Sequence, residues 1–316
     1  MRCFLILLAL AAAPAAAQLD YPVKPVRVIT GAPVGTPADV AVRILAEPLG
    51  ALLGQPVIIE NRPGAIGTIG LGAVVKASAD GYTLGTFTMP STVAQSLLQK
   101  MPYDTVRDFA PVRQLAWVSN VLVVRPAAPF ASVRELVDAA KSRPQQLTFA
   151  SGGNGTPAHV SGELFRLAAA IEMRHVPFNG AVAGVAAVMG EQVDMMFAIA
   201  PAVIGHIHAG RLRALATPAP SRLPALPELP TLAELGYAVD VRDWTGIVAP
   251  AATPKLVVAR LESALSAVLA QKEVKGRLAA AGFEPAESSA DAFGALIRAE
   301  VQKWARVVTE AGIKPD

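Results

Sequence analysis

The segment Phe149–Phe165, FASGGNGTPAHVSGELF, leads from a short apolar run through small and polar residues into a helical pattern. Its first residues complete the β-rich run Gln146–Ser151. A strand that turns through glycines into a helix is the repeating unit of α/β folds. The first N–H groups of such a helix are unpaired and favour an anion. The segment therefore predicts an α/β fold with an anion site at the turn.

The same alternation of strand and helix occurs in two stretches of the chain. The expected strands are Val26–Thr30, Pro56–Asn61 and Tyr82–Thr88 in the first stretch, then Val121–Arg125, Gln146–Ser151, Glu172–Phe178, Val193–Ile199 and Leu212–Pro218, and finally Trp244–Pro250. We expect two lobes, each a mixed, mostly parallel sheet flanked by helices, with a ligand in the cleft. The chain is expected to cross near residues 122 and 242, giving lobe 1 as 18–122 plus 243–316 and lobe 2 as 123–242.

The N-terminus has the pattern of a secretory signal peptide. Arg2 precedes an apolar run, and Ala15, Ala16 and Ala17 form a small-residue cleavage site. We expect residues 1–17 to be removed on export to the periplasm. No later segment has 18 uncharged apolar residues, so the mature chain is not expected to be embedded in a membrane. The single cysteine, Cys3, lies within the signal peptide, which excludes disulfides and cysteine chemistry in the mature chain.

The charge distribution argues against nucleic-acid binding. The formal net charge is +3 and only 17% of residues are charged. There is no run of basic residues interleaved with aromatic residues, which nucleic-acid recognition requires. We therefore expect no nucleic-acid partner.

Two loops are candidates for binding a small acid. The first loop, Gly31–Asp39, has the sequence GAPVGTPAD, and the second loop, Ser151–His159, has the sequence SGGNGTPAH. Each follows a predicted strand and precedes a helix. In the second loop, Gly152 and its neighbours allow a ligand close to the backbone, and the hydroxyl groups of Ser151 and Thr156 can donate. The alternatives are an ordinary strand–helix turn in the first loop and a tight turn needing positive φ in the second.

Patterns for catalysis, metals and nucleotides are weak. Ser151, His159 and Asp194 could form a triad, but Ser151 lacks the G-x-S-x-G context of a nucleophile elbow. His206 and His208 have no carboxylate nearby in the sequence to complete a metal site. The glycines in GAIGTIGLG do not form G-x-G-x-x-G, so close helix packing explains them better than a dinucleotide. We expect no enzyme, no metal and no cofactor.

Several segments together resemble the extracytoplasmic solute receptors of tripartite tricarboxylate transporters, the Bug family. The segments are YPVKPVRVI, LGQPVIIENRPGAIGTIG, DGYTLG, MPYDTVRDFAPV, FASGGNGTPAHVSGELF, HVPFNG, LPELPTLAELGY and WTGIVAP. Their order covers essentially the whole chain after the signal peptide. The resemblance implies a periplasmic-binding-protein fold, type II-like, and a small organic carboxylate held largely by backbone amides and bridging waters.

The resemblance also implies which residues bind the ligand. Gly35 and Thr36 in the first loop, and Ser151, Gly155 and Thr156 in the second, would hold the carboxylate, whereas Asn179 and the strand from Asp194 to Ala198 would line the distal end. The chain departs from the family's usual A-P-G-G in the first loop, where Val34 adds bulk and Thr36 replaces a glycine. It also has Asn179 where the family usually has lysine, which removes a cation near the cleft.

The sequence thus predicts a periplasmic receptor that captures a small organic carboxylate by lobe closure. It would deliver this ligand to integral membrane transporter subunits and act as a monomer, which fits a shuttle. A sensor of the same fold that signals to a membrane partner is the alternative. An exported hydrolase using Ser151 is a third hypothesis from a different class.

Overall fold

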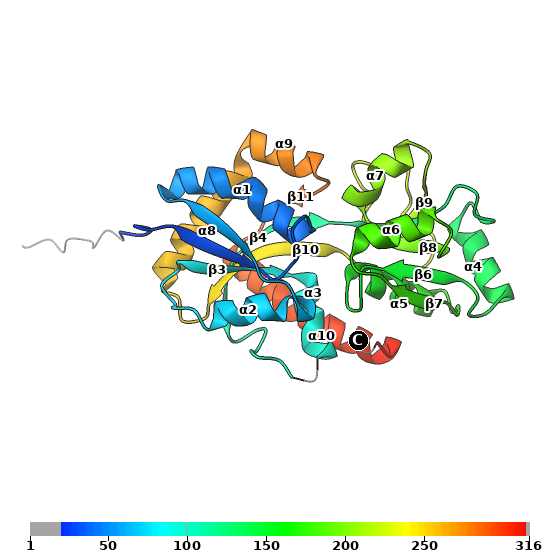
Figure 1. The fold of residues 1–316 in the computed structure, drawn as a ribbon, viewed down its shortest axis with the longest axis horizontal. Coiled ribbons are helices and arrows are strands. Elements are labelled where there is room, and N and C mark those ends of the chain that lie inside the picture. Colours follow the sequence, from blue (N-terminus) through cyan, green and yellow to red (C-terminus); the bar gives the residue numbers. More distant parts are fainter. Residues whose placement is uncertain (1–19, 99, 314–316) are drawn as a thin grey trace, which may run out of the picture.

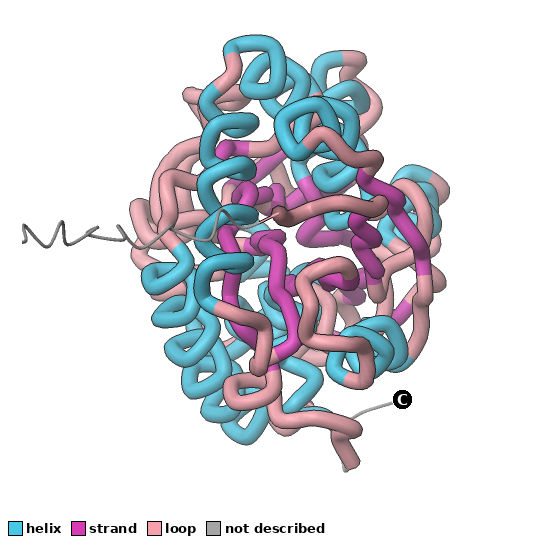
Figure 2. The backbone as a smooth tube through the Cα atoms, turned by 90° about the vertical axis from the view of Figure 1, so that its left-hand side faces the viewer, coloured by secondary structure: helices cyan, strands magenta, loops and turns pink. Residues whose placement is uncertain are grey.

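The computed structural model describes residues 20–98 and 100–313 and has two lobes side by side along its long axis (Figure 1). The expected signal peptide, residues 1–17, lies outside the described residues. Seen from the lobe 1 end, strands lie among helices (Figure 2). This confirms the predicted two-lobe α/β architecture.

Lobe 1 contains a six-stranded sheet in the order β11-β4-β10-β3-β1-β2. Its elements are β1 (Val26–Thr30), α1 (Pro37–Leu53), β2 (Val57–Asn61), η1 (Ala65–Gly67), α2 (Thr68–Val75), β3 (Thr83–Thr88), α3 (Met89–Leu97), β4 (Phe109–Val118), β10 (Asp243–Pro250), α8 (Lys255–Ala270), α9 (Lys272–Ala280), β11 (Glu284–Pro285) and α10 (Ala290–Ala311). β1 runs parallel to β2 and β3, whereas β10 is antiparallel to β3 and β4.

Lobe 2 contains a five-stranded sheet in the order β7-β6-β8-β5-β9. Its elements are β5 (Asn120–Val124), α4 (Val133–Ser142), β6 (Thr148–Ser151), α5 (Pro157–Ala168), β7 (Arg174–Pro177), α6 (Ala181–Met189), β8 (Met195–Ile199), α7 (Ala200–His208) and β9 (Arg213–Ala216). β6 runs parallel to β7 and β8, and β5 is antiparallel to β8 and β9. The strands that begin directly after a crossing, β5 and β10, are antiparallel to both of their neighbours, so both sheets are mixed.

The chain passes between the lobes twice. Ser119 separates the end of β4 from the start of β5, and the chain returns to lobe 1 where β10 begins at Asp243. These crossings were predicted near residues 122 and 242. Because the crossings are short and adjacent in the fold, they are the natural place for a hinge between the lobes.

The sequence analysis did not predict β4 or α3. β4 contains Pro111, Arg113 and Gln114, which interrupt the apolar pattern expected of a central strand. Its register with β10 also shifts twice, so the side chains do not follow a simple alternation. α3 begins at Met89, and the Ser91 hydroxyl accepts a hydrogen bond from the Thr88 N–H at 3.4 Å, as in a capping box.

The largest cluster of buried side chains runs through both lobes. It joins Phe87 and Trp244 of lobe 1 to Leu122 and Phe149 of lobe 2. Trp244 is fully buried and contacts Phe293 of α10 edge-on, with ring centroids 5.4 Å apart. This packing anchors the return crossing to the C-terminal helix.

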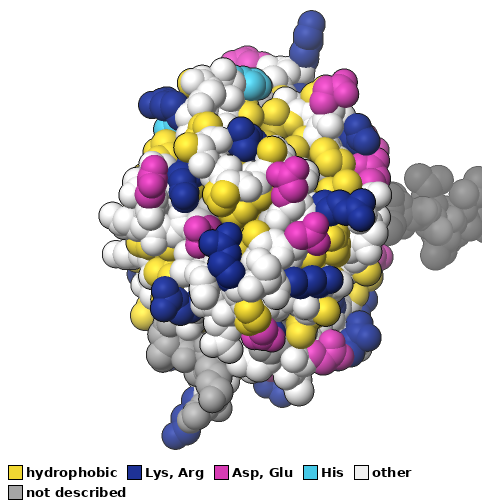
Figure 3. Space-filling view, turned by 90° about the vertical axis from the view of Figure 1, so that its right-hand side faces the viewer, with side chains coloured by type: hydrophobic (Ala, Val, Ile, Leu, Met, Phe, Trp, Pro, Cys, Tyr) yellow, Lys and Arg dark blue, Asp and Glu magenta, His cyan; other side chains and the backbone are white. Residues whose placement is uncertain are grey.

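At the lobe 2 end of the molecule, basic and acidic side chains are interspersed with apolar ones (Figure 3). Over the described residues, no helix is both long and apolar enough to cross a membrane.

Candidate ligand-binding cavity between the lobes

A cavity of about 410 Å³ lies between the two lobes and is lined by residues of both. Lobe 1 contributes the first loop, the segment around η1 and the start of α3. Lobe 2 contributes the second loop, the start of α6 and the end of β8. Both predicted loops therefore meet at one cavity, as expected for the carboxyl ends of parallel strands in two facing sheets.

The first loop turns tightly into α1. Gly35 has a positive φ of 83°, and Thr36 directly precedes the helix, which begins at Pro37. The Thr36 hydroxyl donates to the Pro33 carbonyl at 2.7 Å. The Gly35 N–H donates to Oδ2 of Asp39, four residues later, at 2.9 Å. Proline is favoured at the first helical position because its missing N–H is not needed there.

The second loop has the same conformation as the first. Gly155 has a φ of 73°, and the Thr156 hydroxyl donates to the Gly153 carbonyl at 2.7 Å. The Gly155 N–H donates to Nδ1 of His159, again four residues later, at 3.1 Å. The two loops share the sequence Gly-Thr-Pro-Ala, at residues 35–38 and 155–158. This repeat is a signal that the sequence analysis missed.

The two helix starts face the cavity. Ala38 and Ala158, each the second residue of its helix, both line the cavity. The N–H groups of a first helical turn have no partner within the helix, and the helix dipole is positive at this end. The geometry therefore provides two backbone anion sites on opposite walls of one cavity.

The residues behind the two loops differ in charge. Although burial acts to raise the pKa of Asp39, hydrogen bonds from Arg43, Gly35 and Asn61 outweigh it and hold that pKa below its ordinary value. Burial, with a smaller contribution from the neighbouring His175, lowers the pKa of His159 to about 3. The first loop thus rests on a carboxylate paired with Arg43, and the second rests on a neutral imidazole.

Ser151 pairs with a histidine, but not with the one in the hypothetical triad. Its Oγ lies 2.6 Å from Nε2 of His175, whose ring stacks on that of His159 at 3.9 Å between centroids. Ser151 is fully buried, and its Oγ also accepts from the Gly153 N–H at 3.1 Å. The Asp194 carboxylate accepts from the N–H and the hydroxyl of Thr148. The arrangement shapes the second loop and leaves no exposed nucleophile.

The predicted binding residues fall into two groups. Four line the cavity and six do not: Thr36, Gly152, Thr156 and Asn179 line it, and Val34, Gly35, Ser151, Gly155, Asp194 and Ala198 do not. Val34 is 72% exposed and points to solvent. Gly35 and Gly155 act through their backbone conformation, which allows the following threonine and helix to face the cavity.

Asp194 and Ala198 were expected at the distal end of the site, and the structure places them elsewhere. The Asp194 carboxylate accepts from the N–H and the hydroxyl of Thr148, both at 2.8 Å. Thr148 begins β6, so this pair lies at the end of the parallel strands away from the second loop. Ala198 is fully buried in the core of lobe 2, whereas its neighbours Phe197 and Ile199 line the cavity.

Several lining residues were not predicted from the sequence. They come from β3, α3 and β10: Thr86, Thr88, Pro90, Ser91, Asp243 and Thr245. Among the described residues that line the cavity, Asp243 is the one charged side chain, and there is no lysine or arginine. Because α3 was not predicted, nothing in the sequence analysis indicated that its start would face the ligand.

The glycines around η1 explain the close approach of two lobe 1 segments. A Cβ atom on Gly31 would lie 2.5 Å from the carbonyl oxygen of Gly67, and one on Gly70 would lie 2.8 Å from Cα of Gly31. Both contacts are too short for a side chain, so the glycines allow this segment to pack against the first loop. This agrees with the interpretation that they serve packing.

The lobes contact each other at the second loop. A Cβ atom on Gly155 would lie 2.7 Å from Cδ1 of Leu97 in α3 and 3.4 Å from Cδ1 of Ile66. Gly282 of lobe 1 is similarly close to Pro201 of α7. The described conformation therefore has the lobes in contact on either side of the cavity.

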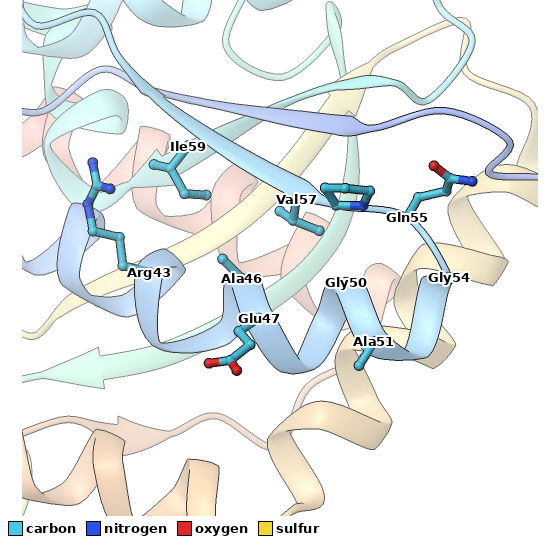
Figure 4. Close-up of a pocket in the computed structure, with 10 residues that line it drawn as sticks. Arg43, Ala46, Glu47, Gly50, Ala51, Gly54, Gln55, Val57 and Ile59 are labelled. Atoms are coloured by element: carbon cyan, nitrogen blue, oxygen red, sulfur yellow. The ribbon is translucent and has the colours of Figure 1, made fainter.

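A wider groove lies on the outer side of lobe 1, along α1 and the beginning of β2 (Figure 4). It is lined by one lobe alone, and its basic residue, Arg43, is paired with Asp39 and hydrogen-bonded to Asn61. The groove lacks convergent polar groups, so the cavity between the lobes is the better candidate for ligand binding. Among the described residues, no cluster of three or more metal-ligating side chains occurs.

The chain is similar to proteins of known family. The family model described as "Tripartite tricarboxylate transporter family receptor" matches residues 41–313. The protein BugT of Bordetella pertussis (strain Tohama I) is 37% identical over 306 residues, covering 96% of this chain and 94% of BugT. These matches confirm the resemblance stated above.

Two solved structures share the fold. That of the periplasmic binding protein BugD has a TM-score of 0.83 at 31% identity, covering 94% of this chain and 100% of that chain. That of Rpa4515 from R. palustris with adipate has a TM-score of 0.85 at 32% identity, with the same coverage. The matched family is one of transporter receptors and BugD is a periplasmic binding protein, so this is a family of binding proteins and not of enzymes.

Proposed function

Because the chain belongs to the tripartite tricarboxylate transporter receptor family, we propose that it captures a small organic carboxylate between its lobes. It would deliver this ligand to the integral membrane subunits of a transporter of that type. One observation supports the proposal most strongly: the two Gly-Thr-Pro-Ala turns start helices on opposite walls of one cavity. The relative solved with adipate supports an organic acid as the ligand.

The electrostatics of the cavity are sufficient for useful affinity. A helix N-terminus stabilises an anion by about 0.3–2 kcal/mol. A hydrogen bond to a charged group contributes about 1.5–3 kcal/mol. Two helix starts and a few hydroxyl donors, less the ordering of the ligand and the lobes, can reach about −8 kcal/mol, which is micromolar binding. No basic side chain is required.

The two short crossings at Ser119 and Arg242 allow the lobes to open and close around this ligand. Closure excludes water and so strengthens each contact to the carboxylate. We also propose that the chain acts in the periplasm, on the basis of the signal-peptide pattern of residues 1–17 and the periplasmic relative BugD.

The test is a melting experiment on residues 18–316 with a panel of mono-, di- and tricarboxylates, amino acids and neutral analogues. A ligand at 100 times its Kd stabilises the protein by about 2.7 kcal/mol, which raises Tm by a measurable amount. We expect at least one acid to raise Tm and its neutral amide or ester not to do so.

The variant Ala158→Asp tests the location of the site. It places a carboxylate at the start of α5, where an acidic residue favours the helix but occupies the anion site. Because Ala158 is 7% exposed, circular dichroism first establishes that the variant is folded, and in the folded variant we expect loss of the acid-dependent shift. The matched control is Leu256→Asp, which adds the same charge at the second position of α8, where Leu256 is 69% exposed. A panel without an acid hit, or an Ala158→Asp variant that binds as the native protein does, would contradict the proposed function.

A further inference from the structure

One side chain that lines the cavity is acidic and, when ionised, repels a bound anion. Asp243 lines the cavity at the start of β10 and is 8% exposed. It is the one charged side chain among the described lining residues. A cavity that only received dicarboxylates would place a second carboxylate in the same low-polarity space as this one, which is unfavourable.

Two backbone N–H groups stabilise the ionised form of Asp243 against its burial. Oδ1 accepts from the N–H of Trp244 at 2.8 Å, and the N–H of Met89 also donates to the carboxylate. Met89 is the first residue of α3, so Asp243 occupies the N-terminus of that helix. The helices α1, α3, α5 and α6 begin at the cavity, and the protein's own carboxylate occupies the anion site of α3. The starts of α1 and α5, which follow the first and second loops, are available to the ligand's carboxylate.

The cations near Asp243 are engaged elsewhere. Arg242 pairs with Glu284 at 2.6 Å, and its guanidinium lies over the ring of Trp117. Lys303 lies 3.7 Å from Glu300 and over the ring of Trp304. Within the described part of the chain, Asp243 forms no ion pair. Its charge therefore faces the cavity without a counterion from the protein.

The surroundings make this carboxylate responsive to a ligand. Burial, together with the nearby charge of Glu300, raises the pKa of Asp243 to about 7, against the effect of the two backbone N–H groups. A buried carboxylate with a raised pKa gains more from a neighbouring positive charge or hydrogen-bond donor than an exposed one does.

We propose that the ligand is an amino acid whose carboxylate binds at the starts of α1 and α5 and whose ammonium group faces Asp243. This inference rests on the proposed function and narrows its ligand class from organic acids in general to zwitterions. Thr88 and Thr245 also line the cavity, and their hydroxyl groups can donate and accept hydrogen bonds. A dicarboxylate of equal length, such as the adipate bound by the relative Rpa4515, is disfavoured here.

Calorimetric titration with matched ligand pairs tests this proposal. The pairs are succinate and 3-aminopropanoate, glutarate and 4-aminobutanoate, and adipate and 5-aminopentanoate, in which an ammonium replaces one carboxylate. At pH 8, where Asp243 is ionised, we expect at least one amino acid to bind tenfold or more tightly than its dicarboxylate.

The variant Asp243→Asn keeps an acceptor for the Trp244 N–H and removes the charge. We expect it to weaken binding of the preferred amino acid at least tenfold. We also expect the ratio of the two dissociation constants in each pair, dicarboxylate to amino acid, to move towards one. Asp240→Asn is the matched control, because Asp240 is exposed and lies three residues earlier. We expect the control to leave both affinities unchanged.

Two results would overturn the proposal: tighter binding of a dicarboxylate than of its matched amino acid, or an unchanged ratio in Asp243→Asn. Both would leave the proposed function intact, because an acid still binds. Failure of every acid in both series would instead reject the proposed function together with this inference.

Discussion

The first and second loops have one conformation and two chemical environments. Both place a positive-φ glycine, a threonine that donates to the carbonyl three residues earlier, and a proline at the helix start. Gly35 is exposed and rests on the carboxylate of Asp39, whereas Gly155 is buried and rests on the neutral imidazole of His159. Gly-Thr-Pro-Ala therefore determines the turn, and the group that accepts from the glycine N–H determines the local charge and the pH response.

The largest expected difference between the loops is in acid stability. His159 has a pKa of about 3 in the folded chain and an ordinary value of 6.5, so the unfolded state takes up the proton first as the pH falls. Its contribution to the free energy of unfolding is therefore full above pH 6.5 and decreases towards pH 3. The slope approaches about 1.4 kcal/mol per pH unit. Asp39, with a pKa below 3.8, loses its contribution only at lower pH.

Denaturant titrations from pH 3 to 8 on the native protein, His159→Asn and Asp39→Asn measure this difference. We expect His159→Asn to flatten the plot of the free energy of unfolding against pH between pH 4 and 6.5. We expect Asp39→Asn to alter the slope of this plot only below about pH 4. Asp243 changes the free energy of unfolding in the opposite direction: because its pKa is raised to about 7, its contribution decreases as the pH rises from about 4 to 7. Asp243 is present in the native protein and in both variants, so subtracting the native curve from a variant curve removes its contribution. Identical slopes in His159→Asn and the native protein would contradict the assignment.

The second expected difference concerns the glycines. Any residue with a Cβ in the left-handed region loses about 1–2 kcal/mol relative to glycine, so Gly35→Ala should lower the free energy of unfolding by about that amount and Gly155→Ala by at least as much. A Cβ at position 35 meets no atom within 4 Å, whereas one at position 155 meets Leu97 of the other lobe. We expect the affinity for the carboxylate to fall about tenfold more in Gly155→Ala.

Calorimetric titration of both variants with the same acid provides the measurement. Equal losses of affinity would mean that contact between the second loop and lobe 1 is not part of ligand capture.

The smallest expected effect is the same in both loops. Thr36→Val and Thr156→Val each remove a hydroxyl that donates at 2.7 Å to a carbonyl three residues earlier. One such bond contributes about 0.5–1.5 kcal/mol to the free energy of unfolding. We expect the two variants to agree within about 0.5 kcal/mol in chemical denaturation. A clearly larger loss in one variant would show that the loops are not equivalent in energy.

The sequence predicted the elements that have a strong local signal. The strand before each loop, the helix after it and the presence of a small-residue turn all follow from composition and spacing over a few residues. The two-lobe arrangement followed from the order of these elements and from the family resemblance. β4 was missed because Pro111, Arg113 and Gln114 interrupt the apolar pattern of this buried strand. Its place in the sheet depends on pairing with β10, which is distant in the sequence.

The direction of individual side chains could not be predicted in the same way. Ser151 was expected to bind the ligand, but its partner His175 comes from β7, a neighbouring strand. Asp194 directly precedes β8 and Asp243 is the first residue of β10, yet Asp194 pairs with Thr148 at the far end of its sheet and Asp243 lines the cavity. Which end of a strand faces a cleft depends on the pairing of the whole sheet, so neither assignment is local.

The central claim is that the starts of α1 and α5 hold the carboxylate between them. A crystal structure of residues 18–316 with the best acid from the melting panel tests it most directly. We predict that the carboxylate oxygens lie within hydrogen-bonding distance, directly or through one water, of backbone N–H groups in the first turns of both helices, near Ala38 and Ala158. A carboxylate bound by one lobe alone, or seated in the outer groove along α1, would contradict the account.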